Sequence, residues 1–182
     1  MTTKLNIFYY IRIGGALLLI CAVMAGLVAG VHSLTEGKIN EYNENKRSAA
    51  FREFFPETVS SKLSEKASDT VNGIYELYNA ENALIGYAVD VSAAGYGGLV
   101  KLMVGIANDG TVQGVSVISH AETKGLTSEE TAGAYFAQFE GKKGELKLGS
   151  DIDAMSGATI SSKAVLKAVQ TALALNLGEE AE

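Results

Sequence analysis

The chain has 182 residues, of which 47% are hydrophobic, and it carries a formal net charge of −6 at pH 7. This length suits one domain of ordinary size with an appendage. The acidic balance argues against a nucleic-acid-binding protein, which needs clustered Lys and Arg. A single cysteine, Cys21, excludes a disulfide framework or a cysteine-based metal or iron–sulfur site within the chain. The histidines, His32 and His120, have no partner at ligand spacing, so no metal site is expected.

The start of the chain is its most apolar part. Residues 13–31 contain no charged side chain, and this run is close to the about 20 residues that a helix needs to cross a membrane. Phe8, Tyr9 and Tyr10 precede it, where interfacial aromatic residues are expected. A cleaved signal peptide is the alternative, but its apolar region is shorter, at about 7–15 residues. We therefore expect a retained, single-pass membrane anchor over residues 1–34.

Charge does not decide the orientation of this anchor. Lys4 and Arg12 precede it, and Lys38, Lys46 and Arg47 follow it. Because basic residues flank both ends, the positive-inside rule favours neither orientation.

Residues 35–72 are predicted to form a helical connector. The polar run over residues 35–55 has interspersed aromatic residues and predicts a helix that leads off the membrane. Pro56 closes it, since the residue before a proline disfavours helix. Residues 57–72 are rich in Ser, Lys, Glu and Thr and are expected to be a polar connector. The globular domain is then expected over residues 73–182.

An α+β fold is predicted for this domain, with a mixed or antiparallel sheet packed against helices. Asn108, Asp109 and Gly110 form a strong hairpin signal, because these residues tolerate positive φ. The β-rich runs that predict strands are residues 74–78, 83–92, 99–107 and 111–119.

Gly95, Tyr96, Gly97 and Gly98 lie between the second and third predicted strands. They are either a flexible hairpin loop or a turn whose backbone N–H groups approach a ligand closely.

Two helices are expected after the strands. Thr127-x-x-Glu130 is a capping box and predicts a helix whose apolar side includes Tyr135, Phe136 and Phe139.

Residues 145–148 are a short strand candidate, and residues 162–177 predict an amphipathic helix that packs on the sheet. Its apolar face is Val165, Leu166, Ala168, Val169, Ala172 and Leu173, and its polar face is Lys163, Lys167, Gln170 and Thr171.

The run that precedes this helix is the main functional candidate: Asp153, Ala154, Met155, Ser156, Gly157, Ala158 and Thr159. Small residues allow another backbone or a cofactor to approach the threonine oxygen closely. The following helix N-terminus offers unpaired N–H groups and partial positive charge, which suit a phosphate. The alternative is an ordinary loop that leads into a helix, with Ser156 or Ser161 as its cap.

The pattern Asp-x-x-Ser-Gly-Ala-Thr resembles the flavinylation motif of the FMN-binding domain family. That family includes the G subunit of the Rnf electron-transport complex and the C subunit of the sodium-pumping NADH:quinone oxidoreductase. The resemblance implies that a flavin transferase takes FMN from FAD and joins its phosphate covalently to Thr159. Asp153, Ser156, Gly157 and Ala158 would be the recognition sequence.

A second stretch resembles the family loop Glu-Thr-Pro-Gly-Leu-Gly, which lies beside the flavin ring. The matching residues are Glu122, Thr123, Gly125 and Leu126. Lys124 and Thr127 stand where the family has its proline and its last glycine, so the ring contacts are left open. From the residues alone, this stretch is a polar turn before a helix.

Two further groups of residues complete the expected cofactor site. Tyr96, Gly97 and Gly98 precede the other two motifs, which is the order found in the family. Lys163 follows the motif, and it is expected either to lie near the phosphate or to be a solvated surface lysine.

The resemblance implies an electron-carrying subunit of an Rnf-type ion-translocating ferredoxin:NAD⁺ oxidoreductase complex. Its partners would be the other subunits and the transferase. The cytoplasmic membrane would hold the anchor, with the N-terminus in the cytoplasm and the FMN domain on the outer, periplasmic side. The alternatives are a C-type subunit of the NADH:quinone oxidoreductase and a membrane-anchored module that binds an anion or flavin non-covalently. A hydrolase with Ser156 or Thr159 as nucleophile is a third.

Overall fold

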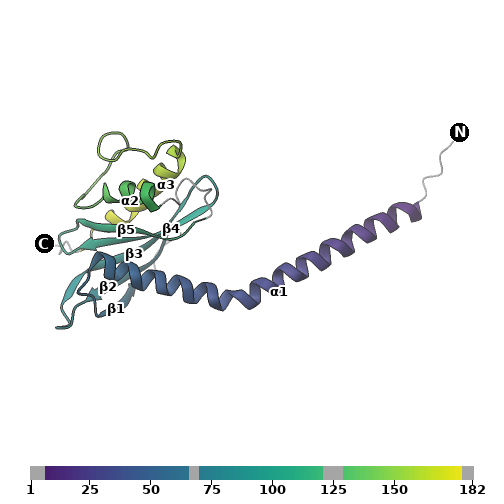
Figure 1. Ribbon diagram of the computed structural model, residues 1–182, viewed down its shortest axis with the longest axis horizontal. Coiled ribbons are helices and arrows are strands. Elements are labelled where there is room, and N and C mark those ends of the chain that lie inside the picture. The colour runs from purple at the N-terminus through teal and green to yellow at the C-terminus, as the bar shows by residue number, and fades with distance from the viewer. Residues whose placement is uncertain (1–6, 66–69, 121–128, 178–182) are drawn as a thin grey trace. The chain divides into compact units, whose positions relative to one another are not determined.

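The computed structural model describes residues 7–65, 70–120 and 129–177 (Figure 1). The chain forms two compact units, Met1–Tyr42 and Asn43–Glu182.

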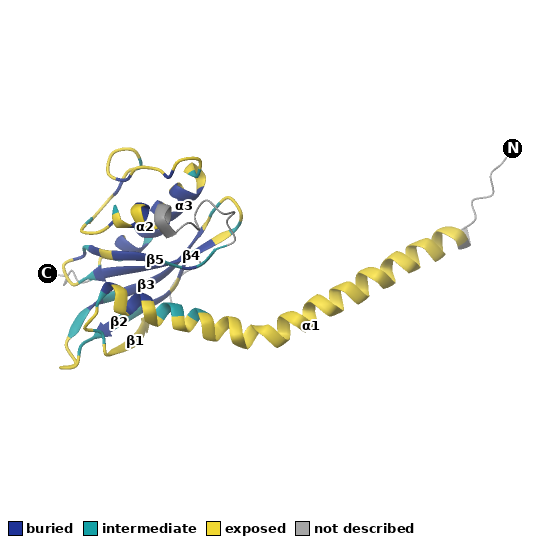
Figure 2. Ribbon diagram, viewed as in Figure 1, coloured by how far each residue is buried: buried dark blue, intermediate teal, exposed yellow. Residues whose placement is uncertain are grey.

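One continuous helix, α1 (Ile7–Phe54), contributes to both units. The two helices predicted over residues 13–31 and 35–55 are therefore a single element. It ends at Phe54 because Phe55 precedes Pro56. Its most apolar 18-residue window has a mean hydropathy of 2.4, and no part of that window is buried (Figure 2). Within the described residues, α1 is thus the one helix that is long and apolar enough to cross a membrane.

The second unit contains a five-stranded antiparallel sheet with the strands in sequence order. The strands are β1 (Ser60–Glu65), β2 (Val71–Tyr78), β3 (Leu84–Ala94), β4 (Leu99–Ala107) and β5 (Val112–His120). The predicted α+β class is confirmed, and the sheet is antiparallel throughout. In the turn between β4 and β5, Gly110 has φ +80° and donates its N–H to the carbonyl of Ala107, at 2.9 Å. The predicted hairpin is therefore confirmed.

The polar composition of residues 57–72 predicts a connector, and this is wrong for β1. This strand lies at the edge of the sheet, and Ser60 to Ser64 are all exposed. Without a buried face, an edge strand needs no alternation of apolar and polar residues. Its pairing with β2 is what makes it a strand.

Two helices cover one face of the sheet: α2 (Glu129–Ala137) and α3 (Thr159–Leu173) (Figure 1). The predicted apolar face of α3 is buried over all of its residues. This helix begins before the predicted residue 162 and ends before residue 177, where Asn176 adopts the left-handed conformation with φ +50°. Residues 145–148 form no strand; this stretch contributes only the isolated bridge from Leu148 to Ile152.

The opposite face of the sheet is covered by the last turns of α1. Ala50, Phe51 and Phe54 pack there against Leu77, Ala88, Met103 and Ile118. Because residues 43–54 belong to the same compact unit as the sheet, this part of α1 is a structural layer of the domain.

Candidate functional site

The candidate motif forms a tight turn that leads directly into α3. Ala158 donates its N–H to the carbonyl of Met155 at 3.1 Å, which closes a four-residue turn. Gly157, at the third position, has φ +73°. A type II turn needs positive φ at that position, which glycine adopts without steric cost. Built onto Gly157, a Cβ would meet no atom within 4 Å, so the space above the turn is open.

Thr159 is the first residue of α3, and its side chain is exposed. The N-cap residue is Ala158, and no side chain caps the helix with a hydrogen bond. Neither Ser156 nor Ser161 has the capping role that the alternative interpretation gives it. The first turn contains no acidic residue. Its N–H groups have no carbonyl partner within the helix, so this helix start can accept an anion.

The side chain of Ser162 bonds to the first and last residues of this turn. This side chain is fully buried. The Oγ accepts a hydrogen bond from the N–H of Met155 at 3.0 Å and donates one to the carbonyl of Ala158 at 3.0 Å. The sequence pattern places Ser162 only at the helix start, and no local signal reveals that its hydroxyl reaches back by seven residues.

The segment around α2 bonds both to the motif and to the first turn of α3 that follows it. The hydroxyl of Tyr135 donates to the carbonyl of Ser162 at 2.9 Å, and burial raises the pKa of Tyr135 to about 12. Just after α2, the Oε1 of Gln138 accepts the N–H of Asp153 at 2.8 Å. The amide of Gln138 also donates to the carbonyl of Asp153, at 3.5 Å.

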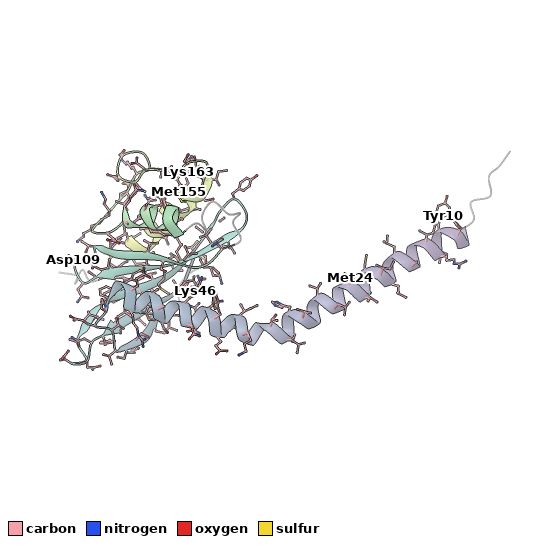
Figure 3. The ribbon with its side chains drawn as sticks, in the orientation of Figure 1. Tyr10, Met24, Lys46, Asp109, Met155 and Lys163 are labelled. Carbon is pink, nitrogen blue, oxygen red and sulfur yellow. The ribbon has the colours of Figure 1, made fainter. Side chains whose placement is uncertain are left out.

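The motif therefore has a buried side and an exposed side. Met155 is 6% exposed and belongs to the main hydrophobic core. Asp153, Ser156 and Lys163 are exposed, and Figure 3 shows Met155 and Lys163 on the α2–α3 side of the domain. Chemically, the exposed side presents the hydroxyls of Ser156 and Thr159, and that of Thr159 lies at the uncapped N-terminus of α3.

The second glycine-rich motif is a hairpin turn between β3 and β4. The N–H of Gly95 donates to the carbonyl of Gly98 at 2.8 Å, and Tyr96 is 76% exposed. Val100 pairs with His120, so this turn lies at the end of the sheet where β5 ends. The predicted ring-contact residues Glu122, Thr123, Gly125 and Leu126 lie outside the described residues, as does Thr127 of the capping box.

Comparison with known proteins adds an independent observation. Residues 95–174 match the FMN-binding domain family. The chain is 32% identical over 185 residues to the G subunit of the Na(+)-translocating ferredoxin:NAD(+) oxidoreductase complex of Acetobacterium woodii, with 89% of each chain covered. It is 40% identical over 112 residues to the G subunit of the proton-translocating ferredoxin:NAD(+) oxidoreductase complex of Clostridium ljungdahlii, covering 57% of this chain and 60% of the relative. Among solved structures, it is similar to Shewanella oneidensis NqrC at a TM-score of 0.45 and 22% identity, covering 64% of this chain and 65% of the other.

Proposed function

Since the chain belongs to the FMN-binding domain family that includes the G subunits of ion-translocating ferredoxin:NAD(+) oxidoreductase complexes, we propose that it is an electron-carrying subunit of such a complex. FMN, when bound, supplies the redox chemistry, and the protein supplies orientation and electrostatics. The other subunits of the complex are then its stable partners.

Thr159 is the proposed covalent attachment point. The observation that carries this assignment is the exposed hydroxyl at an uncapped helix start, directly after the open glycine turn. In the attachment step, the Oγ1 of Thr159 attacks the FMN-side phosphorus of FAD. The new P–O bond forms as the pyrophosphate bond breaks. AMP leaves, and the hydroxyl proton passes to a base of the flavin transferase, so a phosphoester remains on Thr159.

This chain's own groups suit the resulting phosphate. The unpaired N–H groups of the first turn of α3 and the positive end of the helix dipole stabilise the negative charge. No acidic residue in that turn opposes it. Lys163 is exposed one turn along and adds a positive charge nearby. Contacts to the flavin ring are also proposed, on the basis of the family resemblance. They come from Glu122, Thr123 and Leu126, and from the turn that carries Tyr96.

Residues 1–34 are the proposed anchor in the cytoplasmic membrane, and the FMN-binding part is proposed to lie within residues 73–182, on the outer, periplasmic side. The length and apolar character of α1 support the anchor, and the orientation rests on the family resemblance. A covalent bond would keep the cofactor from diffusing away from the protein there.

The test is covalent loading of the full chain, co-expressed with a flavin transferase and purified in detergent. The intact mass should rise by the mass of FMN less one water, and flavin fluorescence should survive denaturation. Thr159→Ala should abolish both signals, whereas Thr159→Ser retains a hydroxyl and should still load. Thr171→Ala is the matched control, because this threonine lies in the same helix and its hydroxyl bonds only to the carbonyl of Lys167 among the described residues.

Two outcomes would contradict the proposal. A fluorescent band that persists in Thr159→Ala shows that another residue is the acceptor. An unchanged intact mass, together with flavin that is lost on denaturation, identifies a module that binds flavin non-covalently.

A further inference from the structure

The peptide unit that joins Ala158 to Thr159 is held by one buried side chain. The carbonyl of Ala158 accepts the N–H of Ser162 at 2.9 Å and also its hydroxyl at 3.0 Å. Because a peptide unit is planar, the direction of this carbonyl also sets the position of the Thr159 nitrogen. The hydroxyl of Ser162 therefore restricts the backbone orientation of Thr159.

The same hydroxyl also holds the other end of the turn. A serine in a helix commonly donates to the carbonyl four residues earlier, and the bond from Ser162 to Ala158 is of that kind. Acceptance of the Met155 N–H at 3.0 Å is an additional contact, made outside the helix. With the bond from the Ala158 N–H to the Met155 carbonyl, both ends of the turn are fixed.

Contacts from α2 and from the core make this arrangement rigid. Met155 is anchored in the core, and the carbonyl of Ser162 receives the hydroxyl of Tyr135, which is 2% exposed. Gln138 holds the backbone of Asp153 on the N-terminal side of the turn. The turn is thus fixed to α2, to α3 and to the core.

We infer that Ser162 is a positioning residue, supported by Tyr135, that fixes the direction in which a nucleotide esterified to Thr159 leaves the protein surface. This inference rests on the proposed attachment at Thr159. An ester bond alone leaves the flavin free to rotate about the threonine side chain and the phosphate. A fixed turn removes the backbone contribution to that motion, so the ring is held in a narrower range of distances from an electron donor or acceptor.

The experiment compares the full-length wild type in detergent with Ser162→Ala and with the control Thr171→Val. Each hydroxyl belongs to α3 and donates to the carbonyl four residues earlier, and only that of Ser162 also accepts the N–H of Met155 in the turn. Amide hydrogen exchange is measured on the unloaded chain, and time-resolved fluorescence anisotropy of the flavin is measured on chains whose loading is established by intact mass.

In Ser162→Ala, exchange of the Met155 amide should accelerate about two- to tenfold, the factor expected for one net hydrogen bond. The rapid component of flavin anisotropy decay should gain amplitude, while Thr171→Val should match the wild type in both measurements. An unchanged Met155 amide with unchanged anisotropy in Ser162→Ala would overturn the inference.

A second variant covers the case in which Ser162→Ala does not fold. Tyr135→Phe keeps the buried ring and removes only the hydroxyl that bonds to Ser162, so it should change both measurements in the same direction by a smaller amount. If Tyr135→Phe matches the wild type in both Met155 amide exchange and flavin anisotropy, the inference is overturned. If the wild type itself gains no flavin mass, the proposed attachment fails, and the exchange of the unloaded chain still shows whether Ser162 closes the turn.

Discussion

Arg47 and Asp90 form an ion pair that joins the end of α1 to the middle of the sheet. The Nη2 and Nε atoms of Arg47 donate to the same carboxylate oxygen of Asp90, at 2.8 and 3.1 Å. The other carboxylate oxygen accepts the amide of Asn72 at 2.7 Å. The side chain of Asp90 is 1% exposed, so these donors, and not water, stabilise its buried carboxylate.

Removing the guanidinium should therefore be strongly destabilising. Arg47→Met leaves the buried carboxylate of Asp90 without its charged partner, and we expect the free energy of unfolding to fall by about 3–5 kcal/mol. The measurement is urea unfolding of the full chain in detergent, followed by the near-ultraviolet circular dichroism of its tyrosines. The control is Lys38→Met, which breaks an ion pair with Glu41 whose side chains are 84% and 63% exposed. That change should cost less than about 1 kcal/mol, and equal losses in the two variants would contradict the prediction.

Phe54 packs directly on two paired glycines, and we expect both to be intolerant of a side chain. Gly105 and Gly114 are opposite each other on β4 and β5. A Cβ on Gly105 would lie 2.6 Å from Cδ2 and 2.9 Å from Cβ of Phe54, and a Cβ on Gly114 would lie 2.6 Å from Cδ1. The Phe54 atoms beside Gly105 include the base of its side chain, so it cannot move aside easily. Gly105→Ala should cost about 1–3 kcal/mol in the same unfolding measurement.

The matched control for this substitution is Gly133→Ala. Gly133 lies within α2, and a Cβ there would meet no atom within 4 Å. Alanine is favoured over glycine inside a helix, so this change should stabilise the protein by about 0.5–1 kcal/mol. The same chemical change is thus expected to have opposite signs at the two positions. A Gly105→Ala variant as stable as the wild type would show that the packing against Phe54 is adjustable.

Gly157 is expected to be required for its backbone conformation and not for its size. With φ +73° and open space around it, Gly157→Ala should cost about 1–2 kcal/mol through backbone strain alone. Gly149→Ala is the control, because Gly149 has φ +86° and equally open surroundings but lies before the motif. Both variants should lose similar stability, and only Gly157→Ala should slow covalent loading by the transferase, measured as intact mass against time. Equal loading rates of the two variants would show that the conformation of the turn does not affect the attachment step.

Tyr135 should make stability fall with pH in the alkaline range. Its pKa is raised by burial to about 12, against about 10 in an unfolded chain. Between these values the folded protein retains a proton that the unfolded chain loses, so the stabilisation is complete below about pH 10 and decreases as pH rises towards 12. The slope due to this group reaches up to about 1.4 kcal/mol per pH unit. The unfolding free energy of Tyr135→Phe, measured across this range, should lack that slope, and identical pH profiles would contradict the assignment.

Several features of the fold were accessible from sequence because their signals are local. The hairpin at Asn108 to Gly110 depends on residues that tolerate positive φ, and the buried face of α3 follows from helical periodicity. The apolar run of residues 13–31 predicts a membrane helix from length and charge alone. In the motif, the position of Gly157 before an exposed threonine at a helix start is also a local pattern.

The remaining features depend on contacts between residues that are distant in the chain. β1 has no apolar alternation and is a strand only because β2 pairs with it. Phe54 fits against Gly105 and Gly114 only when α1 lies on the sheet, and the burial of Asp90 becomes tolerable only when Arg47 reaches it. The candidate site shows the same division. The residue types of the motif determine that a hydroxyl follows a glycine turn, whereas folding alone brings the Ser162 hydroxyl to both ends of that turn, because a hydrogen-bond partner is selected by proximity in space.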